Sequence, residues 1–275
     1  MAVSAKRTAT SLKPLPLPDK PSIAVLPFTN MSGDPEQEYF ADGVVEDIIT
    51  ALSRFKWLFV IARNSSFTYK GHAVDVKQVG SELGVRYVLE GSIRKSGNRV
   101  RVTAQLIDAG TGGHLWADRF DGPLDDIFGL QDQVTGGVVG AISPKLQQAE
   151  IDRARGKPTE DLRAYDYYLR GVASLRGSGG TCGEALNLFR TAIKLDPNFA
   201  AAYGMAAFCY WVPKAWSRIA DREREVAEVN WLVRQVEEVG RDDAVALTGA
   251  GSALACVVGD AEGGAALLDR ALAPT

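Results

Sequence analysis

Few residues in this chain have the types that catalysis usually requires. His72 and His114 are its only histidines, so a Ser-His-Asp arrangement or a histidine-based metal site would have to use one or both of them. His72 lies in a Lys-Gly-His turn and His114 follows Gly112-Gly113. Both contexts indicate exposed loop residues. We therefore predict that neither histidine is catalytic.

Two other patterns have both a chemical and a structural interpretation. Asp121, Asp125 and Asp126 could suggest a metal site, but acidic residues at the start of a helix also interact favourably with the helix dipole. Gly249-Ala-Gly251 is half of a dinucleotide-binding fingerprint, yet no predicted strand precedes it, and helix packing explains it better. No Gly-Lys-Ser/Thr phosphate loop occurs. We expect no catalytic residue, no metal and no cofactor, and no enzyme activity in this chain by itself.

The cysteines and the apolar segments indicate the cellular compartment in which the protein is expected. Cys182, Cys209 and Cys256 are far apart and odd in number, so neither a disulfide framework nor a zinc site is indicated. The most apolar long run, Val245–Gly259, is shorter than the ~18 residues of a membrane span. Residues 1–20 lack the apolar region of a signal peptide. We expect a cytoplasmic protein with no membrane span in this chain, or a periplasmic one if an upstream part carried a span.

The charge distribution argues against binding to nucleic acid. The net charge of the 275 residues is −3, and the local basic cluster, Arg94, Lys95, Arg99 and Arg101, lies at a predicted hairpin tip. Nucleic-acid affinity draws on many phosphate contacts from Lys and Arg. We interpret the cluster as a solvated strand face.

The positions of these residues depend on a hairpin whose register can be derived from its alternation. Gly97-Asn98 suits a two-residue turn, which places Ser96 opposite Arg99. Counting outward gives an apolar face and a polar face. The apolar pairs are Ile93 with Val102, Gly91 with Ala104 and Leu89 with Leu106, and the polar pairs are Arg94 with Arg101, Ser92 with Thr103 and Glu90 with Gln105. A buried apolar face would hold this register, so a cover is required.

The segments around the hairpin predict that cover. Residues 22–28 and 57–62 are apolar runs of strand type, the second one buried on both faces. A helix from an Asp34 cap to about Arg54 carries Phe40, Val44, Ile48 and Leu52 as a stripe that faces the sheet. Further predictions are a helix over 74–83, a third strand through Trp116 and Phe120, and a closing helix over 124–146. Gly136-Gly137 weakens that last helix, so Gly137→Ala should raise stability by about 0.5 to 1 kcal/mol.

From about Pro158 the pattern is helical, rich in alanine and repetitive. One helix-turn-helix unit contains Tyr167, Gly171, Ala185, Phe189, Ala192 and Pro197. A second, irregular unit starts at Tyr203, Ala207 and Tyr210, and Leu247, Gly251, Leu254, Ala265, Leu268 and Ala271 indicate a third. The small and large residues at these spacings are typical of tetratricopeptide repeats.

Taken together, four segments resemble a known family. They are residues 21–55, 63–71 (RNSSFTYKG), 83–122 and 128–134 (FGLQDQV). They are similar to the TolB-like amino-terminal domain that precedes tetratricopeptide repeats, C-terminal to the catalytic domain, in proteobacterial class III adenylate cyclases. The resemblance implies a Pro-rich linker over 1–20, an α/β TolB-like domain with a mixed sheet over 21–155, and an all-α tetratricopeptide solenoid over 156–275.

The resemblance implies a non-catalytic sensory or scaffolding module in signal transduction, which holds a protein or peptide partner in the groove of the repeats. By resemblance this groove is lined by Tyr165, Tyr168, Val172, Phe208 and Trp211. Two alternatives stay open. In the first alternative, the chain is part of an adenylate or guanylate cyclase system. In the second, it is part of a winged-helix transcriptional regulator whose effector domain is absent here. A periplasmic envelope factor like TolB is disfavoured by the missing signal peptide.

The C-terminal helix also predicts self-association. Leu267, Leu268, Ala271 and Leu272 span more than one side of it and should leave an apolar strip exposed.

Overall fold

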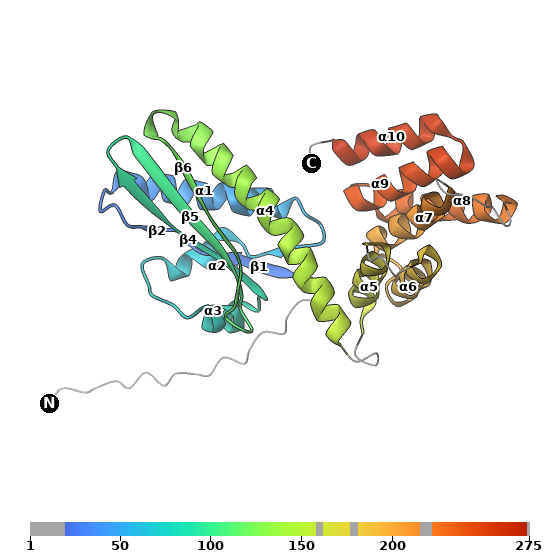
Figure 1. Ribbon diagram of the computed structural model, residues 1–275, viewed down its shortest axis with the longest axis horizontal. Helices are drawn as coiled ribbons and strands as arrows, with labels where there is room; N and C mark the ends of the chain where they lie inside the picture. Colours follow the sequence, from blue (N-terminus) through green and yellow to red (C-terminus); the bar gives the residue numbers. More distant parts are fainter. Residues whose placement is uncertain (1–19, 158–161, 177–180, 215–221, 274–275) are drawn as a thin grey trace. The chain divides into compact units, whose positions relative to one another are not determined.

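The structure is a computed structural model, and it describes residues 20–157, 162–176, 181–214 and 222–273. The chain divides into two compact units, Met1–Leu146 and Gln147–Thr275. Among the described residues, the first unit contains a mixed sheet with helices and the second contains helices only (Figure 1).

The first unit is built on a six-stranded sheet with the order β3-β1-β4-β5-β6, in which β2 also pairs with β4. β1 is parallel to both β3 and β4, whereas β4, β5 and β6 form an antiparallel meander. The strands are β1 (Ser22–Val25), β2 (Thr29–Asn30), β3 (Phe59–Val60), β4 (Tyr87–Ser96), β5 (Arg99–Asp108) and β6 (His114–Pro123).

The predicted hairpin register is confirmed at each pair. Ser96 faces Arg99, Ile93 faces Val102 and Leu89 faces Leu106. Gly97 has a φ of 58°, the positive value that glycine adopts without steric strain. The apolar face is buried, since Leu89, Ile93, Val102 and Leu106 are all 0% exposed. The alternation of the sequence therefore sets which face of the meander meets the core.

Two helices cover this apolar face. α1 (Glu36–Ser53) contacts β1, β3 and β4, and its stripe Phe40, Val44, Ile48 and Leu52 is 0% exposed. α4 (Ile127–Gly156) lies beside the meander in Figure 1 and packs close to Phe120 of β6 at Gly137. The predicted cover is thus shared, with α1 over β1 and β4 and α4 over β6.

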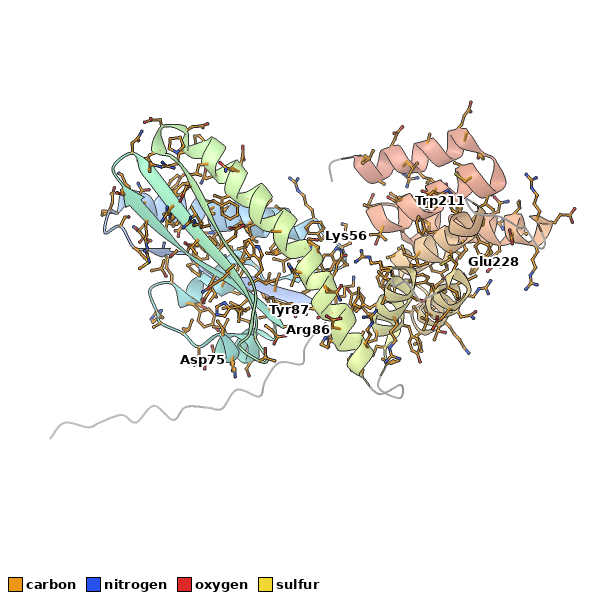
Figure 2. The ribbon with its side chains drawn as sticks, in the orientation of Figure 1. Lys56, Asp75, Arg86, Tyr87, Trp211 and Glu228 are labelled. Atoms are coloured by element: carbon orange, nitrogen blue, oxygen red, sulfur yellow. The ribbon has the colours of Figure 1, made fainter. Side chains whose placement is uncertain are left out.

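A smaller cluster covers one end of the opposite face. α3 (Val76–Leu83) is capped by the carboxylate of Asp75, labelled in Figure 2, and ends at Gly84 in the left-handed conformation. Val79 of α3 packs with Val85 and Val88 where β4 begins. The short helices α2 (Arg63–Ser66), η1 (Phe67–Tyr69) and η2 (Leu124–Asp126) complete the unit.

Three predictions about these elements were wrong in detail. Residues 57–62 form only the two-residue strand β3, and Phe59 is 49% exposed, because β3 is an edge strand that pairs with β1 alone. The N-cap position of α1 is Pro35, not Asp34, and the carboxylate of Asp34 binds Nζ of Lys95 at 2.9 Å. The closing helix does not end at Leu146 but continues to Gly156.

The two central glycines of α4 differ in their surroundings. A Cβ at Gly136 meets open space, whereas a Cβ at Gly137 would lie 2.4 Å from Cε1 of Phe120. The prediction that Gly137→Ala stabilises therefore fails on steric grounds. We expect Gly136→Ala to raise the free energy of unfolding by about 0.5 to 1 kcal/mol, and Gly137→Ala to lower it by about 1 to 2 kcal/mol because the ring must move. Urea unfolding of both variants checks this, and equal shifts would contradict the packing of α4 on Phe120.

The second unit contains successive helices after the end of α4. They are α5 (Ala164–Arg176), α6 (Cys182–Leu195), α7 (Ala200–Lys214), α8 (Arg222–Val239), α9 (Ala244–Ala253), the π-helical turn η4 (Leu254–Val258) and α10 (Ala261–Leu272). Consecutive helices are in contact, and α7 also packs on α9. Glycines allow α7 and α9 to lie in backbone contact, because a Cβ at Gly249 of α9 would lie only 2.2 Å from the carbonyl oxygen of Gly204 of α7.

Candidate functional site

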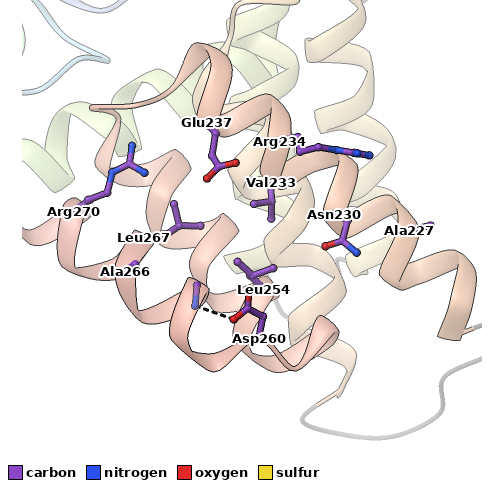
Figure 3. A pocket seen from close by; sticks show the side chains of 11 residues that line it. Ala227, Asn230, Val233, Arg234, Glu237, Leu254, Asp260, Ala266, Leu267 and Arg270 are labelled. Carbon is purple, nitrogen blue, oxygen red and sulfur yellow. Dashed lines mark hydrogen bonds between the residues drawn. The ribbon is translucent and has the colours of Figure 1, made fainter.

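A groove between α8 and α10 is the candidate site of the second unit. Its volume is about 640 Å³, within the range of small-molecule and peptide pockets. Ala227, Asn230, Arg234 and Glu237 recur at helical spacing along α8, and Gly263, Ala266, Leu267 and Arg270 do so along α10. Because such spacing places residues on one face of a helix, each helix presents a continuous wall (Figure 3).

The floor of this α8–α10 groove is apolar. Val233, Leu254 and Leu267 point into it, and they are 6%, 9% and 3% exposed. Leu254 comes from the π-helical turn η4, which ends at Gly259 in the left-handed conformation. Single π-helical turns inside helices are frequent at functional sites. These three residues belong to a core cluster of the unit, so packing against other buried side chains holds them in place.

Charged side chains of both signs form the rim of the groove. Arg234 and Glu237 are exposed on α8, and Asp260 and Arg270 are exposed at the two ends of α10. Asp260 accepts a hydrogen bond from the backbone N–H of Gly263 at 2.9 Å and so caps α10. Arg270 donates to the carbonyl oxygen of Arg241 at 3.1 Å. An apolar floor with a charged rim suits an amphipathic segment better than a purely polar ligand.

The predicted groove residues form two groups that lie apart from this groove. On α5, Tyr165 is 7% exposed, and Tyr168 packs against Phe199 with tilted rings whose centroids are 5.0 Å apart. Burial raises the pKa of Tyr168, and Val172 packs in the same clusters. These three side chains therefore hold α5 in the core.

The second group lies on α7. Phe208 and Trp211 are half-buried and pack on each other with ring centroids 4.9 Å apart. Trp211 is labelled in Figure 2, as is Glu228 of α8, whose carboxylate binds Arg190 at 2.8 Å. This aromatic pair keeps part of its surface accessible, so it stays a predicted contact for a partner.

Sequence reasoning missed the residues of the α8–α10 groove. Trp231 of α8, which does not line the groove, is 41% exposed and packs edge-on against Tyr203. The available signal was the spacing of Ala227, Asn230 and Arg234, which marks one face of α8. The pairing of that face with α10 depends on tertiary packing.

The residues that could do chemistry have structural roles or are exposed. His72 and His114 are both exposed. Asp126 accepts from the backbone N–H of Gly129, and Asp125 accepts from Asn98. Asp121 pairs with Arg101 at 2.7 Å, and this hydrogen bond lowers the pKa of Asp121. Within the described ranges, no group of three or more His, Cys, Asp or Glu side chains could hold a metal ion.

The cysteines and the C-terminal leucines differ in how deeply they are buried. Burial raises the pKa of the Cys209 thiol to about 12, whereas Cys182 is half-buried. Leu267 is buried and Leu268 partly buried, so the predicted apolar strip of α10 narrows to Leu272, which is 83% exposed. None of the helices that the structure describes is long and apolar enough to cross a membrane.

This chain is similar to part of a family of transcriptional regulators and to part of a cyclase. Residues 19–135 match the model of the HilA/YgeH-like transcriptional regulator, second domain. Putative adenylate cyclase 3 of Rhizobium meliloti (strain 1021) is 54% identical over 191 residues, which cover 69% of this chain and 32% of that relative. The chain thus spans about a third of the length of the cyclase relative.

Solved structures give weaker matches, to about half of the chain. Lipoprotein GNA1162 from Neisseria meningitidis is 22% identical and covers 45% of this chain and 99% of its own, with a TM-score of 0.35. TolB from Acinetobacter baumannii is 20% identical and covers 47% of this chain and 30% of its own, with a TM-score of 0.34. The comparisons therefore relate this chain to a region of an adenylate cyclase and to a domain of transcriptional regulators.

Proposed function

We propose that this chain is a non-catalytic sensory or scaffolding module that binds a protein or peptide partner in signal transduction. In this proposal the first unit is a TolB-like α/β domain and the second is a short tetratricopeptide-type solenoid. Its setting is the cytoplasm, and Leu272 offers a small apolar contact for self-association.

The packing of the helices supports the solenoid part of the proposal. The helices form three successive pairs, α5 with α6, α7 with α8, and α9 with α10. Gly171 of α5 lies against Phe189 of α6, since a Cβ there would be 2.6 Å from the ring. Stacked helix pairs of this kind create extended binding surfaces without catalytic groups.

The observation that carries the proposal is the α8–α10 groove. Its floor contains the apolar side chains of Val233, Leu254 and Leu267, and its rim carries both charge signs. An amphipathic helix or extended segment can place apolar side chains on such a floor and charged ones along the rim. Phe208 and Trp211 would supply a further contact on α7.

The relation to the cyclase suggests where the effector lies. This chain covers 32% of putative adenylate cyclase 3, and class III cyclase chemistry requires two metal-binding carboxylates in a catalytic domain. We propose that the chain acts as the accessory region of such an enzyme and that cyclic nucleotide synthesis takes place in another domain.

A second candidate is a module of a winged-helix transcriptional regulator, and the match of residues 19–135 to the second domain of HilA/YgeH-like transcriptional regulators favours a regulator of transcription. The two candidates share the binding role and differ in the effector domain that the module serves.

A domain exchange tests the proposal. The matching segment of putative adenylate cyclase 3 is replaced by the full chain described here, so that α8 and α10 are included, and cyclic AMP is measured in a host without its own cyclase. Ala266 lines the groove and Ala265 is exposed beside it without lining it. We expect Ala266→Arg to change cyclic AMP output at least about threefold, about 0.7 kcal/mol of altered coupling, and Ala265→Arg to leave it unchanged.

Equal behaviour of the two arginine variants, at equal protein level and melting temperature, would contradict a role for the groove. The chain alone, incubated with ATP and Mn²⁺, should form no cyclic AMP above a heat-inactivated sample. Turnover there would refute the non-catalytic assignment.

A further inference from the structure

An arginine-rich face on the first unit lies opposite the face that α1 and α4 cover. Arg94 of β4 pairs with Arg101 of β5, and Arg119 of β6 pairs with Thr103 one step further along the sheet. Arg99 lies two residues before Arg101, on the same face. Neighbouring strands are about 4.8 Å apart and alternate residues about 7 Å, so the four arginines lie within about 15 Å of one another on this face.

The positive charge of this arginine face is only partly neutralised. Arg101 binds Asp121 with two hydrogen bonds of 2.7 and 2.9 Å. Arg94 directs its Nε to the sulfur of Met31 at 3.4 Å. Among the described residues, no carboxylate lies within 4.0 Å of the guanidinium groups of Arg94, Arg99 or Arg119. Hydrogen bonding from Arg101 lowers the pKa of Asp121, and the charges of Arg119 and Arg99 act in the same direction. On this face the carboxylate of Asp121 therefore neutralises only one of the four arginine charges.

This arrangement disfavours the isolated sheet. Like charges directly opposite each other on neighbouring strands are destabilising, and Arg94 faces Arg101 directly. The side chain of Arg101 is 50% exposed, and Arg94, Arg99 and Arg119 are also exposed. A bound anion would remove the repulsion, because each guanidinium group can offer two parallel donors to a carboxylate or phosphate.

The surroundings of the arginines distinguish between the two kinds of anion. The positions between and beside them on this face are Ser92, Ser96, Thr103, Ala117 and Asp121. Single-stranded nucleic acids bind sheets by stacking their bases on aromatic side chains, and this face offers none among these positions. Residues 21–150 also carry a net charge of −4, which opposes a long polyanion at a distance and tolerates a short acidic segment.

We propose that the face formed by Arg94, Arg99, Arg101 and Arg119 docks an acidic protein segment whose Asp and Glu carboxylates pair with the guanidinium groups. This docking face and the α8–α10 groove belong to different units and share no residue, so a ligand can bind one without the other.

Fluorescence anisotropy of a labelled glutamate oligomer with the full chain tests the proposal, at about 0.02 M ionic strength where screening is weak. We expect binding that weakens as salt is added. Arg94→Glu combined with Arg119→Glu should weaken it at least about tenfold. Arg54, exposed at the end of α1, is the control, and Arg54→Glu should change the affinity less than about twofold.

Three results would overturn the proposal. They are no binding of the glutamate oligomer at low ionic strength, equal binding by the double variant and the wild type, and tighter binding of an oligodeoxynucleotide of equal charge. The last result would reassign the face to nucleic acid. A glutamine oligomer should not bind, and thermal melts confirm that each variant is folded. A negative result in this binding experiment would not contradict the proposed role of the α8–α10 groove, because that role is tested with the α10 variants Ala266→Arg and Ala265→Arg.

Discussion

Gly249→Ala is expected to lower the free energy of unfolding of the second unit by about 2 to 4 kcal/mol, although alanine is the better helix former. The added Cβ would lie 2.2 Å from the carbonyl oxygen of Gly204, and a Cβ at Gly204 would lie 2.5 Å from the Cα of Ala246. These contacts are with backbone atoms, so no side chain can rotate to relieve them. The helices α7 and α9 would have to separate, which opens the centre of the unit.

The matched control for this substitution is Gly183→Ala, because a Cβ at Gly183 of α6 meets open space. We expect it to leave stability unchanged or to raise it by up to about 1 kcal/mol. Urea unfolding followed by circular dichroism measures both variants. If Gly249→Ala melts like the wild type, α7 and α9 are not in backbone contact and the packing described for the unit is wrong.

Lys157→Met is expected to cost about 2 to 4 kcal/mol of stability, because it leaves a buried carboxylate without its cation. Asp166 is 2% exposed, and Nζ of Lys157 donates to its two oxygens at 2.7 and 2.8 Å. The backbone N–H of Arg163 donates to the same carboxylate at 3.1 Å. The expected loss lies below that of a fully buried pair, since the Lys157 side chain is 27% exposed.

A double-mutant cycle separates the ion pair from other effects of the lysine. Lys157→Met combined with Asp166→Asn should recover part of the loss, because the second change removes the unpaired charge. Lys194→Met, at an exposed position of α6, is the surface control and should have an effect below about 0.5 kcal/mol. A double variant less stable than Lys157→Met would show that Asp166 stabilises the unit without Lys157.

The hairpin was predictable because its two faces differ in polarity at each pair. One register buries Leu89, Ile93 and Val102, and a slip by one residue would expose them. The end of α3 before Gly84 was also predictable locally, whereas its start was predicted at residue 74 and lies at Val76, after the Asp75 cap. Such features depend on neighbours in the sequence, so the sequence alone contains them.

Features that depend on distant residues were not predictable. The effect of Gly137→Ala changes sign because Phe120, from another element, occupies the space of the new Cβ. The strand at Phe59 is short because it lies at the edge of the sheet. The α8–α10 groove depends on the packing of two helices that are distant in the sequence. Of the aromatic residues predicted to line a groove, Tyr165 and Tyr168 pack around Phe199, whereas Phe208 and Trp211 stay half-buried on α7.

The central claim is that this module holds a partner polypeptide in the α8–α10 groove. Photo-crosslinking at the groove tests this claim most directly. A photoreactive amino acid replaces Ala266 in one sample and Ala265 in another, and cells that produce each full chain are irradiated. Because Ala266 lines the groove and Ala265 does not, the account predicts a discrete covalent adduct from position 266 that is absent from position 265. Adducts of equal yield from both positions, or none from position 266, would contradict it.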